Sequence, residues 1–523
     1  MSGDLGNTHH TCPPLKELSP STVKEILDFK CGDRDMPDKP SNFLFIFSDQ
    51  HTRRAAGCYG HSLVKTPNLD RLAEHGTLYK NAYCNGPICV PCRGSLATGR
   101  YVNDPTLEVW DNCSPYYGQA PSWGHRLMDQ GHRVVSIGKL HYRDTADDNG
   151  FDESIVPLHI IKGVGMLYTL LRDPMPTGRA FPYGVQNAGV GNSTYLDYDR
   201  DITERALDWI KNEAPTHTDK PWALFVSLVC PHPPWVAPPE FYDLYPHQDL
   251  DMPLAYGLDE RPMHPGLEDY RTNFGIQGEF DDATLRKVIA AYYGMVSYLD
   301  DNIGKLISAL EASGLADTTR ILYTSDHGES MGQKGMFSKC NMFEESVGVP
   351  LIMSGPGIPS GKEIATPVQL LDVFPTILEA TGAQIVDEDQ ELPGTSLVQL
   401  AEGDEPDRVI LSEQHSAGAK SAVYLLRRGD WKYVRYMEDY PPQLFNMASD
   451  PNELHDLGGD PTYQDECDRC EAALRGLINP EDVDQRAKAK QAERIELGGG
   501  VEAILAKGSP GYTPAPGEDP TFR

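Results

Sequence analysis

The sequence lacks the features of a membrane-bound or exported protein. No segment of its 523 residues approaches the run of about 20 apolar residues that a membrane-spanning helix needs. The first twelve residues, MSGDLGNTHHTC, are polar and include no apolar core for a signal peptide. We therefore expect a cytoplasmic protein without a membrane partner.

Basic residues are also scarce, since 46 Lys and Arg stand against 77 Asp and Glu, a formal net charge of −31. A surface of that sign repels nucleic acids, so we expect no nucleic-acid partner. It does not attract anionic substrates at long range either. Any site that binds an anion must therefore be positive locally, against the field of the whole chain.

Paired cysteine motifs are nearly absent. The eleven cysteines are odd in number and scattered, and with no export signal we expect free thiols. Cys467 and Cys470 form one CxxC, on a predicted helix. A structural zinc site needs a second pair or nearby histidines, and the sequence supplies neither around this motif. These two thiols are therefore predicted to be ordinary helix-surface or core residues.

Alternating strand and helix patterns predict an α/β fold. The apolar run FLFIF at 43–47 is typical of a strand buried on both faces. A long helix begins near Asp281, because apolar residues then recur on one face at helical spacing. Thr66 is predicted to cap a shorter helix. Further strands are predicted at 134–137, 222–229, 320–325 and 349–353, and further helices at 66–76, 122–131, 201–212 and 369–381. This alternation favours a large, mostly parallel sheet sandwiched by helices.

The length of the chain predicts two domains with flanking segments. We expect an N-terminal arm at 1–40 and a catalytic domain at 41–404. Short strands at 423–426 and 431–436 and a helix near 462–477 predict a small C-terminal α+β domain at 405–480. A C-terminal helix and tail occupy 481–523, and the Pro- and Gly-rich end, 508–523, is expected to be a tail rather than core.

Polar residues follow several predicted strands, where open α/β sheets form their binding sites. Asp49 ends the first strand, and Asp326 and His327 follow strand 320–325. A carboxylate and an imidazole placed there can ligate a divalent cation beside Asp49. A cap or a turn explains each of them alone, but their shared placement favours one site.

Two further clusters fit the same site. Cys89 precedes a potentially helical segment, so it lies near a helix N-terminus, which favours anions. A buried structural thiol is the alternative, but Arg93 and a proline stand where a core needs apolar residues. Lys139 and His141 follow strand 134–137 and, as alternate residues of an extended segment, are predicted to face one side. His232 follows strand 222–229.

The chain resembles the sulfatase family of the alkaline-phosphatase-like superfamily. Cys89-Val90-Pro91-Cys92-Arg93 is the C-x-P-x-R sequence that formylglycine-generating enzyme recognises. The resemblance runs in order from about residue 41 to 460, through SDQ at 48–50, TPNLDRLAEHG at 66–76, GKLH at 138–141, PHPP at 231–234, SDHGE at 325–329, KCNMFEESVGVPLI at 339–352, DVFPTILEATG at 372–382 and WKYVRY at 431–436.

Within that family the chain is similar to the choline-sulfatase and phosphonate-monoester-hydrolase branch, which has Asp-Gln and Asp-His where other members have Asp-Asp and Asp-Asn. Both pairs occur here, as Asp49-Gln50 and Asp326-His327. Phosphonate hydrolases typically lack the Lys-x-His pair that this chain has at Lys139 and His141. The resemblance therefore implies a sulfatase that hydrolyses aryl or small alkyl sulfate monoesters.

The resemblance also implies the machinery. Cys89, oxidised to formylglycine, is the nucleophile, and one divalent cation, Ca, Mn or Mg, is bound by Asp49, Cys89, Asp326 and His327. Gln50 is left outside that set. The other implied roles are orientation of the formylglycine oxygens by Arg93 and Lys139, sulfate release by His141 as base, sulfate binding and leaving-group protonation by His232 and Lys339, and a sulfate contact from Asn112.

Two alternatives stay open, a phosphonate monoester or phosphodiester hydrolase of the same fold, and a non-catalytic anion-binding protein. The expected partners are a small-molecule sulfate ester and, transiently, formylglycine-generating enzyme. We also expect a homo-oligomer, in which the C-terminal tail can cross to a neighbouring subunit. The aromatic residues Trp110, Tyr116, Tyr117 and Trp235 are candidates for lining the alcohol pocket.

Overall fold

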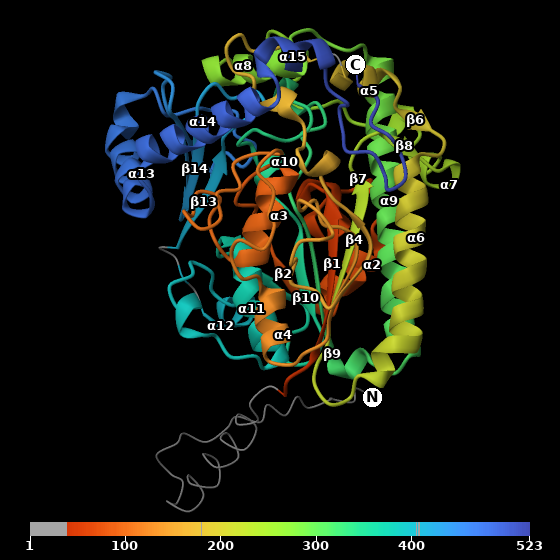
Figure 1. Cartoon of the computed structure of the whole chain (residues 1–523). Helices are drawn as coiled ribbons and strands as arrows, with labels where there is room; N and C mark the ends of the chain where they lie inside the picture. The colour runs from red at the N-terminus through yellow and green to blue at the C-terminus, as the bar shows by residue number, and fades with distance from the viewer. Residues whose placement is uncertain (1–38, 179, 404, 406–407, 523) are drawn as a thin grey trace, which may run out of the picture. The chain divides into compact units, whose positions relative to one another are not determined.

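The computed structural model describes residues 39–178, 180–403, 405 and 408–522 (Figure 1). The predicted N-terminal arm lies outside the described residues except for its last two. Within the described part of the chain, no helix combines the length and the apolar character needed to cross a bilayer.

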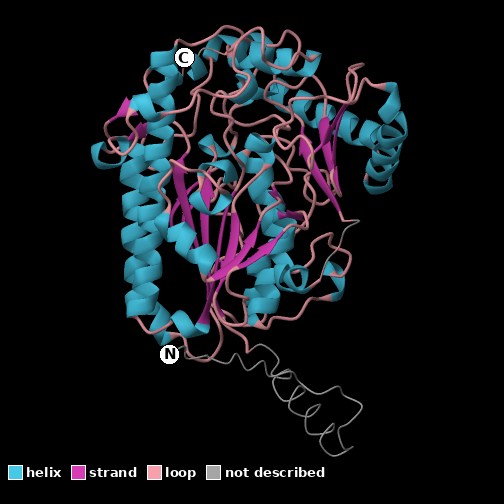
Figure 2. Cartoon of the chain, turned by 180° about the vertical axis from the view of Figure 1, so that it is seen from behind, coloured by secondary structure: helices cyan, strands magenta, loops and turns pink. Residues whose placement is uncertain are grey.

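An eight-stranded sheet forms the centre of residues 40–523 (Figure 2). Its strands lie in the order β11-β2-β10-β9-β1-β7-β4-β5. The pairs β9-β1, β1-β7, β7-β4 and β4-β5 are parallel, whereas β10 runs antiparallel to both β9 and β2. In chain order the strands are β1 (Asn42–Asp49), β2 (Gly76–Tyr79), β4 (Val134–Lys139), β5 (Glu153–Leu158), β7 (Ala223–Pro231), β9 (Thr319–Ser325), β10 (Leu351–Ser354) and β11 (Lys362–Ile364).

Helices cover both faces of this sheet, as the apolar run at 43–47 requires. Successive side chains of a strand point to opposite faces. Leu44 and Ile46 belong to the core that includes α2 (Pro67–Glu74), α6 (Thr194–Asp208) and α9 (Asp282–Ala312). Phe43, Phe45 and Phe47 belong to the core of the other face, with α3 (Cys89–Thr98), α4 (Trp123–Asp129) and α11 (Val373–Thr381). The predicted fold class is confirmed.

Two local predictions were wrong. Thr66 does not cap α2 through its side chain; its hydroxyl accepts from the backbone N–H of Gly57 and donates to Asp70. The helix predicted at 201–212 begins earlier, at Thr194, because Ser193 accepts a hydrogen bond from the backbone N–H of Leu196 and caps it. Capping chemistry is therefore supplied by residues whose free oxygen faces the helix, which sequence spacing does not reveal.

A second, antiparallel sheet follows, with the order β13-β14-β15-β16. Its strands are β13 (Val409–Gln414), β14 (Val423–Arg428), β15 (Trp431–Tyr436) and β16 (Gln443–Asn446), and α13 (Gln464–Leu477) packs on it. Cys467 and Cys470 lie buried on α13 as free thiols. Helices α14 (Pro480–Leu497) and α15 (Gly500–Lys507) complete the chain before its tail. The exact domain boundaries stay a prediction.

Shorter elements connect these layers. Tight β-pairs are formed by β3 (Ala82–Tyr83) with β12 (Val368–Gln369), and by β6 (Gly189–Val190) with β8 (Val236–Ala237). The other α-helices of the described residues are α5 (Ala180–Gln186), α7 (Pro239–Tyr242), α8 (Pro265–Phe274), α10 (Glu344–Val347) and α12 (Leu397–Glu402).

Candidate active site

Four neighbouring strands deliver polar residues to one edge of the large sheet. The strands β9, β1, β7 and β4 are adjacent and parallel, so their carboxyl ends lie together (Figure 1). Asp49 ends β1 and Lys139 ends β4, while Asp326 and His232 follow β9 and β7 directly. The topology thus places residues that are far apart in sequence around one point.

A compact group of possible metal ligands lies at that point. One ligand atom from each of Asp49, Cys89, Asp326 and His327 lies within 4.8 Å of the others, and all four residues are buried. The Cys89 Sγ is 3.3 Å from His327 Nε2 and 3.7 Å from Asp49 Oδ1. His327 Nε2 is 3.4 Å from Asp326 Oδ1. Two carboxylates and an imidazole, converging at such distances, form a donor set that suits a divalent cation.

The orientation of His327 fits the same interpretation. Its Nδ1 lies 3.1 Å from the carbonyl oxygen of Gly328, and a carbonyl accepts only from a protonated ring nitrogen. The hydrogen therefore resides on Nδ1, and Nε2 presents a lone pair to Asp49, Asp326 and Cys89. A backbone partner on the second nitrogen is typical of metal-binding histidines.

The guanidinium of Arg93 compensates the charges of both carboxylates, Asp49 and Asp326. It stands four residues after Cys89 on α3, so both side chains lie on one face of the helix. Its Nε donates to Asp326 and its Nη2 to Asp49, each at 3.0 Å. Its Nη1 donates to the carbonyl of Lys139 at 2.7 Å and to Ser227 Oγ at 2.9 Å.

Two lysines make the site positive overall. Lys139 Nζ is 2.7 Å from Asp49 Oδ2. Lys339 Nζ donates to Cys89 Sγ at 3.2 Å and to Gln50 Oε1 at 2.7 Å. Three cationic side chains, those of Arg93 and the two lysines, therefore surround two carboxylates. This local excess is what an anion site requires in a chain whose formal net charge is −31.

Burial and neighbouring charges separate the pKa values of the acidic groups. Burial alone raises the pKa of Asp49, but Lys139 and the other nearby cations hold it well below its usual range. Burial and the charge of Asp49 raise the pKa of Asp326 to about 7. Burial, followed by the charge of Asp49, raises the pKa of the Cys89 thiol to about 11. A thiol with that pKa is protonated at neutral pH and is a poor nucleophile.

A large cavity of about 720 Å³ opens above these groups. Of the residues already described, Cys89, Lys139 and Lys339 line this cavity. The other predicted site residues, Asn112, His141 and His232, line it as well, and so does one predicted aromatic residue, Trp235. The other aromatic candidates lie elsewhere: Trp110 and Tyr116 are buried in the core, and Tyr117 is exposed beneath Arg143. Besides Trp235, the aromatic residues on its wall are Tyr168, Phe181, Tyr183, Tyr195, Phe274, Tyr512 and Phe522.

His141 reaches the cavity by a different backbone path from the one predicted. Strand β4 ends at Lys139, and His141 has a φ of 58°, so the segment is not extended. Both side chains nevertheless line the cavity. The chain turns at this point because backbone N–H groups of Leu140 and His141 both donate to the carbonyl of Leu158.

Two residues of the site, Glu329 and Thr513, were not predicted from the sequence. Glu329 accepts from the backbone N–H groups of Met331 and Ser338 at 2.8 and 2.6 Å, and from the side-chain amide of Gln50. It thereby orients the amide oxygen of Gln50 towards Lys339. The SDHGE motif contained this signal. Thr513, from the C-terminal tail, also lines the cavity, and no sequence pattern pointed to it.

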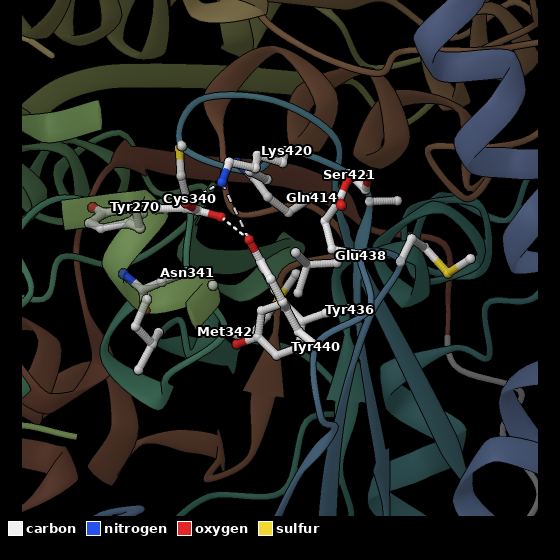
Figure 3. A pocket seen from close by; sticks show the side chains of 18 residues that line it. Tyr270, Cys340, Asn341, Met342, Gln414, Lys420, Ser421, Tyr436, Glu438 and Tyr440 are labelled. Carbon is white, nitrogen blue, oxygen red and sulfur yellow. Dashed lines mark hydrogen bonds and ion pairs between the residues drawn. The ribbon is translucent and has the colours of Figure 1, made fainter. Parts of the chain in front are cut away.

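A second, much smaller cavity lies between α8 and the C-terminal sheet (Figure 3). Its volume of about 30 Å³ holds one or two water molecules and excludes an ester. Asp269 accepts from Lys420 at 2.9 Å and from Tyr440 at 2.7 Å across it. On its wall, the Tyr270 hydroxyl donates to the carbonyl oxygen of Lys339 at 2.7 Å. Tyr270, on the wall of this cavity, therefore helps to hold the loop that carries Lys339. The cavity itself is too small to be a substrate site.

Comparisons with known proteins agree with this arrangement. The sulfatase family model matches residues 41–383, more than half of the chain, and the model for the C-terminal part of N-sulphoglucosamine sulphohydrolase matches 332–479. The choline-sulfatase of Rhizobium meliloti (strain 1021) is 31% identical over 80% of this chain and 83% of its own. Arylsulfatase K of Danio rerio is 30% identical over 84% of each chain.

Among solved structures, the phosphonate monoester hydrolase of Agrobacterium radiobacter superposes with a TM-score of 0.66 at 24% identity. The match covers 84% of this chain and 95% of that one, and at this identity it shows the shared fold alone. The family model and the identity to the choline-sulfatase carry the assignment: the chain belongs to the sulfatase family.

Proposed function

We propose that this sulfatase hydrolyses sulfate monoesters of aryl or small alkyl alcohols, with formylglycine at position 89 as the nucleophile. The observation that carries the proposal is the position of Cys89. Its Sγ lies at the base of the large cavity, between the carboxylate and imidazole group and the ammonium of Lys339. An electrophilic sulfur bound above it would be in reach of this one side chain.

One divalent cation is proposed to bind Asp49, Asp326, His327 and an oxygen of the modified residue 89. When bound, it lowers the pKa of an oxygen nucleophile and neutralises charge on sulfate oxygens. Calcium, magnesium and manganese all accept carboxylate oxygens, and manganese tolerates the imidazole of His327 best. In the thiol form, Cys89 Sγ marks the place that the oxygens of formylglycine would take.

The modification solves the problem of an unreactive thiol. A hydrated aldehyde presents two hydroxyl groups on one carbon, one to attack sulfur and a second whose deprotonation later expels sulfate. Formylglycine-generating enzyme is the proposed transient partner for the conversion. Arg93 and Lys139 hold these oxygens in place, because both side chains are buried and cationic and lie against Asp49.

The remaining site residues are proposed to bind the sulfate group and to transfer protons. His232 donates through Nδ1 to the Pro233 carbonyl at 2.7 Å, which leaves Nε2 for the cavity. Burial and the charge of Lys339 hold the pKa of His232 well below its usual range, and a bound sulfate raises it again. His232 and Lys339 then bind sulfate and protonate the leaving alcohol. His141 is the base for sulfate release, and Asn112 contacts sulfate.

A mass measurement tests the nucleophile. The tryptic peptide Asn81–Arg93 contains Cys89. Conversion of a thiol to an aldehyde lowers its mass by about 18 Da, the change that the proposed nucleophile requires. An active preparation from the native host should contain this lighter peptide. An active preparation with only the unmodified peptide would refute the proposal.

A phosphonate monoester hydrolase is the second candidate, because the pairs Asp49-Gln50 and Asp326-His327 are shared with that branch of the family. Rates on matched aryl sulfate and aryl phosphonate esters separate the two. We expect the sulfate ester to be faster, since Lys139 and His141 both line the cavity. Choline sulfate, an aryl sulfate and a sulfated sugar, assayed side by side, identify the alcohol. Among the described lining residues no carboxylate is present, so a cationic alcohol such as choline would have to bind to the aromatic side chains of the cavity.

A further inference from the structure

The C-terminal tail of the chain returns to the catalytic cavity. Residues 508–513 form part of its wall, on the same cavity that Cys89 and Lys139 line. The tail was expected to lie on the surface, yet Thr513 and Ala515 are each only 6% exposed. Its exchange with a neighbouring subunit stays a prediction, but in this chain the tail reaches the chain's own site.

Tyr195 of α6 anchors the tail at this position. Its hydroxyl donates to the carbonyl oxygen of Thr513, and its ring lies 5.4 Å from that of Tyr512 in an edge-to-face arrangement. Ala515 joins the hydrophobic core on the α6 and α9 side of the sheet. The ring of Tyr195 also lies 5.7 Å from His232, so the anchor itself borders the site.

Thr513 makes a direct contact with His141. The hydroxyl oxygen of Thr513 is 2.9 Å from His141 Nε2, and both side chains are buried. The other ring nitrogen, Nδ1, is buried as well and has no hydrogen-bond partner among the described residues. One nitrogen of the imidazole therefore contacts the tail, and the other makes no hydrogen bond to the described residues.

The contact with Thr513 determines which tautomer of His141 can accept a proton through Nδ1. A neutral imidazole carries one hydrogen, and the nitrogen that lacks it is the one that accepts a proton. If Nε2–H donates to Thr513, Nδ1 is the basic nitrogen. If the hydrogen sits on Nδ1 instead, the ring has no basic nitrogen facing away from Thr513.

We propose that Thr513 is a positioning residue for His141, and that it accepts from Nε2–H so that Nδ1 is free to take the proton released in sulfate expulsion. The inference rests on the proposed function, in which His141 is the base of that step. The proton passes from the hydroxyl on the carbon of residue 89 to His141 Nδ1, the C–O bond to sulfate breaks, and the aldehyde re-forms. The Nε2–H bond to Thr513 stays intact throughout.

The test compares Thr513→Val, which removes the acceptor and keeps the shape, with Thr513→Ser, which keeps the acceptor. Thr521→Val, an exposed threonine of the same tail, is the matched control. The Val variant should release sulfate about 5–15-fold more slowly in single-turnover experiments, the factor that corresponds to one hydrogen bond of about 1–1.5 kcal/mol. Release of the alcohol should keep its wild-type rate, so kcat and KM fall together and kcat/KM is unchanged.

The outcomes distinguish the two proposals. Wild-type protein that hydrolyses sulfate esters with Cys89 unconverted, or that stays inactive with Cys89 converted, contradicts the proposed function. A converted, active wild type beside a Val variant with unchanged sulfate release overturns the role of Thr513. So does a Val variant that loses alcohol release and sulfate release equally, because that indicates a general loss of structure. If the Val variant does not fold, Thr513→Ala against Thr513→Ser makes the same comparison.

Discussion

Arg93→Met is expected to lower the free energy of unfolding more than the removal of any single surface charge does. The reason is that it removes the positive charge that compensates two buried carboxylates, those of Asp49 and Asp326. The guanidinium is 2% exposed and donates four hydrogen bonds, to Asp49, Asp326, Ser227 and the carbonyl of Lys139. After the substitution Asp49 keeps Lys139 as a partner, but Asp326 loses the arginine Nε that lies 3.0 Å from its carboxylate.

The magnitude follows from this geometry. Removing one partner of a buried ion pair destabilises a protein by up to roughly 3–5 kcal/mol, and by less at a pH where Asp326, whose pKa is about 7, takes up a proton in place of the lost partner. Arg205→Met is the control, since Arg205 pairs with Asp201 on α6 and both side chains are more than 40% exposed. A surface pair of that kind contributes about 0–1 kcal/mol.

The assay is denaturant unfolding with a chelator, on protein that keeps Cys89 as a thiol, so that any effect of Arg93 on conversion is removed. The midpoint shift, multiplied by the slope of the transition, gives the change in unfolding free energy. Added divalent cation should restore part of the loss in the Arg93 variant, because it replaces the missing positive charge and binds only the folded site. If Arg93→Met costs no more than Arg205→Met, the assignment of Arg93 as counter-charge is wrong.

Three further predictions concern single side chains. Cys89→Ala should abolish turnover and leave the denaturation midpoint nearly unchanged, since the thiol contacts polar groups of Asp49, His327 and Lys339 at the base of the cavity; wild-type rates would contradict its role as nucleophile. His141→Ala should slow sulfate release more than alcohol release, so that covalently sulfated enzyme accumulates and is seen by mass; its absence removes His141 from that role. Burial raises the pKa of Asp300 to about 6 in the folded state, so the unfolding free energy should fall as pH rises from about 4 to about 6. Asp300→Asn should flatten that fall in denaturation series across this window, and an unchanged slope would show that other groups cause it.

The strand ends could be predicted from the sequence because each is a local signal. An apolar run followed by a polar residue identifies the end of a strand, and parallel strands of one sheet bring such ends together. Asp49, Lys139, Asp326 and His232 were found in this way. The order of the strands was not predictable, because it depends on which helices pack on which face. Neither was the left-handed turn at His141, since a non-glycine residue there carries no local signature.

Three of the four aromatic candidates, all except Trp235, failed for a related reason. Trp110 and Tyr116 lie close in sequence to Asn112, which does line the cavity, but proximity along an irregular segment does not determine which side chain points inwards. Tyr195 and Thr513, by contrast, reach the cavity from α6 and from the tail. Their contributions are tertiary contacts, 318 positions apart in the chain, and only the folded structure reveals them.

The C-terminal sheet is connected to the site through buried ion pairs, although it contributes few side chains to the cavity itself. Lys432 of β15 is buried between Glu344 and Glu453, at 2.8 and 2.5 Å, and Lys334 donates to both oxygens of Glu345 at 2.9 Å. Glu344 and Glu345 begin α10, at the end of the loop that carries His327 and Lys339. The loop is therefore held at one end by β9 and at the other by buried ion pairs, one of them to the second sheet. Since a buried charge without its partner is costly, the ion pair between Lys432 and Glu344 couples the position of this loop to that of the C-terminal sheet.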